Sequence, residues 1–517
     1  MASGLPLESL SRLHLSSSAD PSVKSSFRLG TAAQHVDECL CQTSIGLSAL
    51  AAARFHELRT GIKQDVTVDP RHAVLAFSSE KYYLINGELP QVALFDDLAG
   101  MYKTRDGYVR LHTNFPHHKQ GLLDILDCSS DRHSVAAALC SWDAIAFEEE
   151  AIRRGMCAVA LRPFDASPLY TEGQAHRPGT VLPVRIEKIG EAQKRRIEER
   201  GRFRNALEGL RVLDMTRVLA GPVCGRTLAE HGADVLLITS PSLPALPVLD
   251  IETSRGKRTA QLDLSQDGDA ETLRTLLSGA DVFLQAYRPG SLTKRGFSPH
   301  DVAHLRPGIV CASLSAYPPD STYAHVRGFD SLVQTLCGTN VAEAQAYKEF
   351  MDKSGGGTDG LPPYRALPMQ ALDHAAGYFL AFGISAALCK TIEVRPRPSL
   401  LKLSLTYVVL VSRRYGAQWL RGLGTLDPQI AFGRGKPLPT RSWPPDAEVA
   451  ALHVDVGCCL HADAERGRAA GGSTAGDQPP QTLTTIRHAA LLDETPVRVR
   501  CAPMRLDAHA PRWLEGS

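Results

Sequence analysis

The stretch that decides the fold runs from Arg211 to Ile238 and reads RVLDMTRVLAGPVCGRTLAEHGADVLLI. It opens with a short apolar run, Arg211–Met215, which has the length and composition of a buried strand. Gly221-Pro222 then opens a helical segment that continues to about Glu230, and Ala233–Ile238 is a second apolar run. A strand, a helix and a second strand in immediate succession are typical of a βαβ unit with parallel strands.

The same alternation continues downstream. We expect a helix at Asp269–Leu277, a third strand at Asp281–Gln285 and a fourth at Ile309–Leu314. This rhythm predicts an α/β fold with a Rossmann-like parallel sheet core flanked by helices. The core is assigned to residues 208–390, with additional smaller α/β modules attached to it.

The segments on either side of this core have different compositions. Residues 1–29 are Ser-rich and are interpreted as a loose tail, and residues 30–190 as an N-terminal module. The charged stretch Glu187–Arg204 is interpreted as a linker helix with a solvated face. Residues 391–517 are assigned to a C-terminal module, in which the Gly- and Pro-rich segment 465–481 is a flexible loop.

The N-terminal module carries its own helix and strand signals. Ser44–Leu58 is rich in Ala and Leu and predicts a helix, and Asp65–Asp69 alternates like a strand. Tyr108–His112 follows a turn dipeptide and predicts another strand, and Trp142–Arg154 predicts an amphipathic helix.

The composition excludes several classes of function. The 517 residues include 57 basic and 56 acidic side chains, so we expect neither a nucleic-acid partner nor a membrane partner. The 12 cysteines contain no CxxC pair, and we interpret them as reduced thiols of an intracellular protein. The expected location is the cytoplasm, with the peroxisome and the mitochondrion left open. Because His117 and His118 are adjacent and have no carboxylate at ligand spacing, no metal site is predicted.

Several short motifs follow the opening stretch in a fixed order. They are RVLAGP at 217–222, RGKR at 255–258, YRPG at 287–290, RGFD at 327–330 and LDHAAG at 372–377. Together they resemble the class III (CaiB/BaiF-type) CoA-transferase family, and in particular its long, two-module members. The segment HTNFPHH at 112–118 resembles those long members as well. The resemblance implies that the chain transfers coenzyme A from an acyl-CoA thioester to a carboxylic acid.

The resemblance implies that Asp373 is the catalytic nucleophile. In this family such an aspartate attacks the thioester, passes through a mixed anhydride and then carries CoA as an aspartyl thioester. We expect backbone N–H groups at the start of its helix to stabilise the oxyanions. On spacing alone, an aspartate that opens an apolar helix is a cap, and this alternative stays open. The neighbouring His374 is the weaker candidate for an assisting group.

A second set of residues is expected around coenzyme A. The resemblance, together with the basic side chains and the helix start after Arg217, implies that they contact the phosphates, the nucleotide or the pantetheine arm. They are Arg217, Leu219, Ala220, Leu262, Tyr287, Arg288, Lys294 and Tyr317. Gly221 is expected to let the backbone approach the ligand. CoA thioester is then a substrate, and no tightly bound cofactor is expected. The alternative is that these residues only pack or lie on the surface.

Two other functions remain open. Racemases of the same superfamily use a histidine in a GHD motif, where this chain has Gly328-Phe329-Asp330, and His325 would replace it only after a register shift. A non-catalytic CoA-binding relative is the other alternative, since the segment after Leu388 departs from the family pattern. Residues 30–190 resemble a second half-copy of the family's C-terminal half that has lost its nucleophile. We therefore expect either a homodimer or a pseudo-dimer within one chain.

Overall fold

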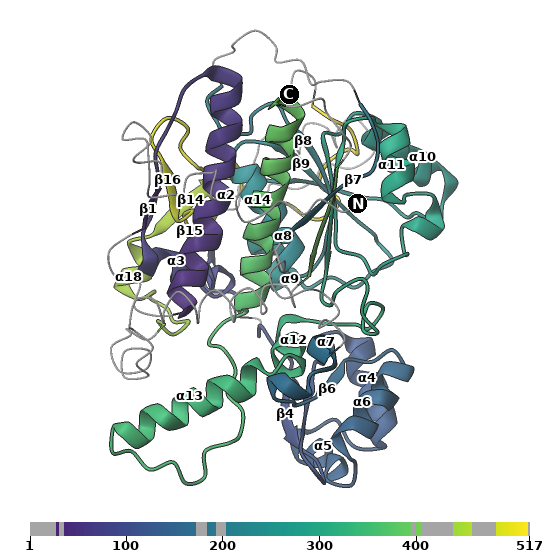
Figure 1. Cartoon of the computed structure of the whole chain (residues 1–517), viewed down its shortest axis with the longest axis vertical. Coiled ribbons are helices and arrows are strands. Elements are labelled where there is room, and N and C mark those ends of the chain that lie inside the picture. The colour runs from purple at the N-terminus through teal and green to yellow at the C-terminus, as the bar shows by residue number, and fades with distance from the viewer. Residues whose placement is uncertain are drawn as a thin grey trace.

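The computed structural model describes residues 27–29, 36–91, 93–171, 184–192, 203–393, 399–404, 438–457 and 482–514. The loop predicted at 465–481 and most of the tail predicted at 1–29 lie outside these residues. Figure 1 shows two parts, a larger body that contains the central sheet and a smaller lobe beneath it.

A seven-stranded sheet forms the centre of the body, in the order β10-β9-β8-β11-β12-β13-β7. All neighbouring strands are parallel except β13 and β7, which are antiparallel. The strands are β7 (Arg185–Lys188), β8 (Arg211–Met215), β9 (Asp234–Thr239), β10 (Arg258–Gln261), β11 (Val282–Gln285), β12 (Val310–Ser315) and β13 (Ser399–Ser404). The predicted Rossmann-like parallel sheet is confirmed. The linker helix predicted at Glu187–Arg204 is wrong at its start, because Glu187 and Lys188 pair with β13 as part of an edge strand.

Helices cover both faces of this sheet (Figure 1). One face carries α8 (Ala220–Glu230), α14 (Ala371–Glu393) and α2 (Val36–Thr60), whose apolar side chains share one core. The other face carries α10 (Asp267–Ser278) and α11 (Pro299–Leu305). Helix α14 is long and apolar enough to cross a membrane, but 94% of its most apolar window is buried inside the protein. It is therefore the central core helix, packed between α2 and α8.

Strands from distant parts of the chain complete the body. Two three-stranded sheets, β1-β2-β16 and β14-β15-β3, join the N-terminal and C-terminal segments. Their strands are β1 (Phe27–Leu29), β2 (Val66–Val68), β3 (Leu84–Ile85), β14 (His453–Gly457), β15 (Thr482–Ile486) and β16 (Ala490–Leu492). Residues 27–29, which the sequence analysis placed in the tail, thus pair with β2. In the described part of 391–517, β13, β15 and β16 each join strands from earlier in the chain, so the separate C-terminal module is not seen there.

The smaller lobe is built on the antiparallel sheet β4-β5-β6. Its elements are β4 (Gly100–Lys103), β5 (Tyr108–Leu111), α4 (Pro116–Leu126), α5 (Arg132–Leu139), α6 (Ala144–Arg153) and β6 (Ala158–Ala160). Helices α12 (Asp330–Leu336) and α13 (Thr339–Lys353) lie next to it in Figure 1. The remaining helices are α3 (Pro70–Ala76), η2 (Ser79–Lys81), η3 (Phe164–Ala166), α7 (Pro168–Thr171), α9 (Pro247–Thr253), η5 (Thr293–Arg295) and α18 (Ala447–Ala450).

Candidate active site

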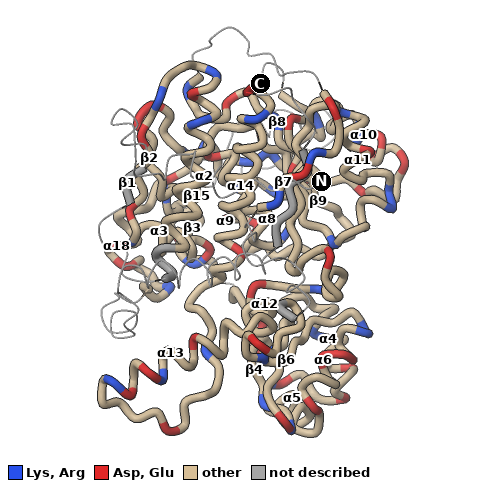
Figure 2. The backbone as a smooth tube through the Cα atoms, in the orientation of Figure 1, with Lys and Arg blue, Asp and Glu red and all other residues tan. Residues whose placement is uncertain are grey.

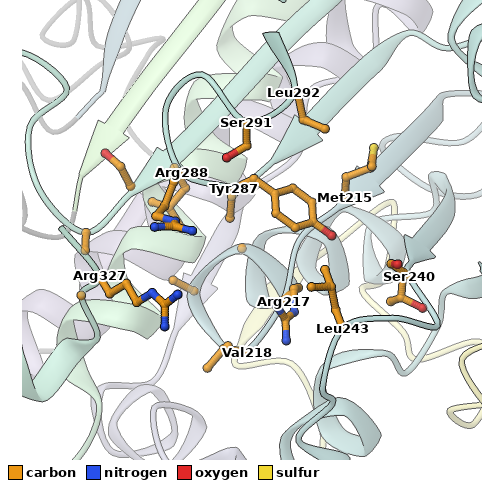
Figure 3. Close-up of a pocket in the computed structure, with 18 of the residues that line it drawn as sticks. Met215, Arg217, Val218, Ser240, Leu243, Tyr287, Arg288, Ser291, Leu292 and Arg327 are labelled. Atoms are coloured by element: carbon orange, nitrogen blue, oxygen red, sulfur yellow. The ribbon is translucent and has the colours of Figure 1, made fainter. Parts of the chain in front are cut away.

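A cavity of about 610 Å³ lies at the carboxyl ends of β8, β9, β11 and β12, where open α/β sheets bind their ligands. Figure 3 shows part of its lining. Seven of the nine side chains proposed for catalysis or CoA binding line it. They are Arg217, Leu219, Ala220, Leu262, Tyr287, Arg288 and Asp373. Figure 2 shows Lys and Arg interspersed with Asp and Glu along the backbone.

The other two proposed residues do not reach the cavity. Lys294 is exposed in η5, and its neighbour Arg295 lines the cavity instead. Tyr317 is buried, with 1% of its surface exposed, and lies behind Gly328. A Cβ atom on Gly328 would lie 2.7 Å from the ring of Tyr317, so this glycine lets the chain pass directly over the ring. The sequence alone does not show which of these residues lines the cavity and which lies beneath its lining.

The turn between β8 and α8 forms one wall of the cavity. Val218 has φ +74°, a left-handed conformation that is rare for a β-branched residue and is often found at functional sites. Gly221 lines the cavity, where it was expected to let the backbone approach a ligand, and it also has a packing role. A Cβ atom at Gly221 would lie 2.6 Å from the side chain of Thr216, so the glycine lets the start of α8 pack closely against the turn that follows β8.

Besides Arg295, three arginines bring positive charge into the cavity. The guanidinium of Arg217 donates to the carbonyl of Pro244 and lies 5.6 Å from the centre of the Phe115 ring. Arg288 is exposed and lines the cavity, and Arg327 donates to the Nε2 of His118. None of the three forms a salt bridge with a carboxylate in the part of the chain that the structure describes. The cavity therefore has the charge and the hydrogen-bond donors to hold an anionic ligand.

Asp373 lies in the first turn of α14, but another residue caps this helix. The Oδ2 atom of Asp330 accepts the N–H groups of Leu372 at 2.8 Å and of Asp373 at 3.0 Å. Gln334 donates to the other carboxylate oxygen of Asp330. The N–H groups at the start of α14 were expected to stabilise the oxyanions of the reaction. Those of Leu372 and Asp373 instead donate to Asp330, so this expectation is corrected. These contacts also leave the carboxyl of Asp373 without a capping role, at the wall of the cavity.

The two carboxyls lie in an acidic and buried environment. Burial raises the pKa of Asp330 to about 6, although the hydrogen bonds that it accepts act in the opposite direction. Burial raises the pKa of Asp373 well above its ordinary value, and the negative charges of Asp330 and Glu80 raise it further. Such shifts are typical of reactive carboxyls that have been desolvated by their site.

The side chain of His374 points away from the cavity. It is fully buried, its Nε2 lies 3.1 Å from the Oε2 of Glu80, and its ring stacks on Phe77 at 5.3 Å. His374 therefore does not line the cavity that Asp373 faces. Its side-chain contact is instead with Glu80, which belongs to the N-terminal segment.

Sequence reasoning assigned no catalytic or binding role to several residues that line the cavity. Phe115, His117 and His118 come from the smaller lobe, and Arg327 and Phe329 precede α12. Both groups lay within motifs that resemble the family, but the motifs alone did not show that they face one cavity.

The position where a racemase of the superfamily has its motif histidine is occupied by Phe329 in this chain. Phe329 lines the cavity, whereas His325 is exposed and does not. The nearest ring to Phe329 is that of His112, stacked on it at 3.8 Å. Burial lowers the pKa of His112 to about 3, so this ring is neutral at physiological pH.

Comparison with known proteins identifies relatives of the core. Residues 207–394 match the family model of CoA-transferase family III. A probable fatty acyl-CoA transferase of Mycobacterium tuberculosis is 32% identical over 199 residues, which cover 35% of this chain and 46% of that protein. An acetyl-coenzyme A transferase of Hypoxylon pulicicidum is 30% identical over 226 residues, which cover 43% of this chain and 35% of that protein.

Two further relatives have similar coverage. A formyl-CoA:oxalate CoA-transferase of Rhodopseudomonas palustris is 30% identical over 195 residues, or 35% of this chain and 42% of that protein. A crystal structure of a hypothetical protein from Mycobacterium tuberculosis shares 26% identity, covers 42% of this chain and 60% of that chain, and has a TM-score of 0.34. The chain thus spans less than half the length of these curated relatives.

Proposed function

We propose that this chain moves coenzyme A between an acyl-CoA thioester and a carboxylic acid, because residues 207–394 match the family model of CoA-transferase family III. One observation carries the proposal. Asp330 caps α14, so the carboxyl of Asp373 faces the cavity without the structural task that an aspartate at this position usually has. The names of the relatives, which are acyl-CoA, acetyl-CoA and formyl-CoA transferases, support the same reaction class.

The proposed chemistry starts with the ionised carboxylate of Asp373. It attacks the carbonyl carbon of the acyl-CoA, the carbon–sulfur bond breaks, and a mixed anhydride and CoA thiolate form. The thiolate attacks the aspartyl carbonyl, and the acyl group leaves as a carboxylate. The acceptor carboxylate then attacks the aspartyl-CoA thioester and releases the thiolate. Finally the thiolate attacks the acceptor's carbonyl in the second anhydride, which restores Asp373. In this scheme CoA is a substrate, and no tightly bound cofactor takes part.

The substitution Asp373→Asn tests this role, because it keeps the shape of the side chain and removes the nucleophilic oxygen. We expect the transfer rate to fall by about a thousandfold or more, while CoA affinity and folding remain close to those of the parent. Hydroxylamine should trap the aspartyl thioester in the parent and nothing in the variant. Transfer at the parental rate in Asp373→Asn would exclude the mechanism.

The two remaining alternatives predict other results. A racemase would exchange the α-proton of an acyl-CoA with deuterium from solvent without forming a trapped aspartyl group. A non-catalytic relative would bind CoA and show neither reaction. The exposed position of His325 argues against the racemase.

We also propose that one chain holds a complete site as a pseudo-dimer. The cavity includes Phe115, His117 and His118 from the N-terminal segment together with Asp373 from the core, which supports this arrangement over a homodimer. Sedimentation measurements on the active protein distinguish the two.

A further inference from the structure

The carboxyl of Asp330 is completely buried, and hydrogen bonds rather than salt bridges hold it within the described part of the chain. Its Oδ2 atom caps α14 at Leu372 and Asp373, while its Oδ1 atom accepts a hydrogen bond from the Nε2 of Gln334. Gln334 is buried as well, and it does not line the cavity. These hydrogen bonds therefore connect Gln334 to Asp373 through Asp330.

The orientation of the Gln334 amide follows from its other partners. Its Oε1 atom accepts the backbone N–H of Leu367 and the Nδ2 of Asn340, both at 3.1 Å. A rotated amide would turn its own N–H groups toward these two donors, so the oxygen must face them and Nε2 must face Asp330. The donors thus follow one another toward the carboxylate, and each polarises the next. The hydrogen bond from Gln334 lowers the pKa of Asp330, which burial raises.

Asn340 joins this network to the base of an arm. The arm is defined as residues 339–366, which contain α13 and the segment that returns toward α14, and Figure 1 shows α13 extending away from the smaller lobe. At its base, the N–H of Arg365 donates to the carbonyl of Asn340 at 2.9 Å, and the Nδ2 of Asn340 donates to the carbonyl of Arg365 at 3.2 Å. The Oδ1 of Asn340 accepts the hydroxyl of Thr335 at 2.8 Å. The two ends of the arm and the cap of α14 therefore share one buried network.

The charge of Asp330 acts on the carboxyl that faces the cavity. The negative charges of Asp330 and Glu80 raise the pKa of Asp373. Two further groups act on Asp330 by their charge, Arg110 of β5 and a protonated His374. The amide in the network carries no charge, so its influence on this group of residues depends on the hydrogen bond that it donates.

We propose that Gln334 is a positioning residue for the reaction, whose amide holds Asp330 as the charged cap of α14 and connects this cap through Asn340 to the base of the arm. The inference rests on the proposed function, because it takes Asp373 as the nucleophile. Gln334 fixes the cap that places Asp373, and it sets how strongly Asp330 opposes the ionisation of Asp373. Displacement of the base of the arm then reaches the nucleophile through the same network.

Two replacements of similar shape test the hydrogen bond, with the single-turnover transfer rate measured as a function of pH. Gln334→Met removes the donor, so Asp330 ionises less readily and opposes the ionisation of Asp373 less. The pH at which the rate increases should fall by about one unit. Gln334→Glu keeps both accepted hydrogen bonds but adds a carboxyl next to Asp330, so the same pH should rise by about one unit.

The same replacements at Gln345, which is exposed on α13, are the matched control and should leave the profile in place. Infrared spectra of the protonated carboxyl groups, recorded as a function of pH, follow the titration without turnover, and Asp330→Asn identifies the signal of Asp330. CoA affinity should be unchanged in both Gln334 variants, because this side chain does not line the cavity. If Gln334→Met does not fold, Gln334→Glu decides alone, since it keeps the shape of the side chain.

A purely structural role for Gln334 would lower the rate or the stability without moving the two profiles in opposite directions. Shifts in one common direction, or no shift in a folded Gln334→Glu, would therefore overturn the proposal. The proposed function fails separately. If hydroxylamine traps no aspartyl group but the infrared titrations of the two variants move in opposite directions, the network stands and the transfer mechanism does not.

Discussion

The carboxyl of Asp373 is held among other acids, and this has a consequence for the pH dependence of transfer. Its pKa is raised by burial and by the charges of Asp330 and Glu80, and only the ionised carboxylate is a nucleophile. The rate should therefore increase with pH until Asp373 is fully ionised. Glu80→Gln removes one negative charge but keeps a hydrogen-bond partner for His374, so the increase should occur at lower pH.

The measurement is the single-turnover transfer rate as a function of pH for the parent and for Glu80→Gln. Glu149→Gln, on the exposed surface of α6, is the control and should leave the profile in place. A profile that Glu80→Gln does not move, in a folded variant, would show that the charge of Glu80 does not act on the nucleophile.

At the scale of single residues, the sequence identifies the candidate nucleophile but not what surrounds it. Asp373 could be predicted because it lies in a motif of neighbouring residues. The cap that Asp330 provides joins residues 43 positions apart, and Glu80 lies 294 positions from His374. Contacts of this kind depend on how elements pack, and one sequence contains no local pattern for them.

Among the elements, the crossing of α14 and α8 decides where Asp373 lies. Gly377, one turn after Asp373, allows this close approach, because a Cβ atom there would lie 2.7 Å from the carbonyl oxygen of Ala220. We expect Gly377→Ala to lower the free energy of unfolding by about 1–3 kcal/mol through overpacking. Denaturant unfolding measures this change.

Gly268 offers a matched control on another helix. A Cβ atom at Gly268 would meet nothing within 4 Å, so Gly268→Ala in α10 should raise the free energy of unfolding by about 0.4–1 kcal/mol. Equal stability of Gly377→Ala and the parent would mean that the two helices move apart at little cost. In that case the crossing does not fix the position of Asp373.

The elements that the sequence predicts well are those with a buried, apolar and local pattern. Strands β8, β9, β11 and β12 and helices α8 and α10 were predicted within a few residues. Strand β10 was missed, because its sequence RTAQ has neither an apolar run nor clear alternation. Strand β7 was interpreted as part of a charged linker, since an edge strand pairs on one side only and tolerates charged side chains.

Across the whole molecule, a buried ionic cluster joins segments that are far apart in sequence. Arg255 forms salt bridges with Glu230 of α8 at 2.9 Å and with Glu252 of α9 at 3.3 Å, and all three side chains are almost completely buried. The same guanidinium donates to the carbonyl of Ile486 in β15, which pairs with β3 of the N-terminal segment. The cluster therefore connects the core sheet to both ends of the described chain.

Replacement of Arg255 by methionine would leave the buried carboxylate of Glu230 without its salt bridge, while Glu252 would keep the one that it forms with Arg226. Breaking a buried pair costs more than the pair contributes when it is intact, because the remaining charge is desolvated and uncompensated. We expect Arg255→Met to lower the free energy of unfolding by about 3–5 kcal/mol, and the whole protein to unfold at a lower denaturant concentration. Arg274→Met, which removes an exposed pair with Glu271, should cost about 0–1 kcal/mol.

Because β15 and α8 share the guanidinium of Arg255, the fluorescence of the whole chain and the protease sensitivity of the C-terminal strands should change in one transition. Two separate transitions in the parent, with the C-terminal strands released first, would show that the cluster does not couple the segments.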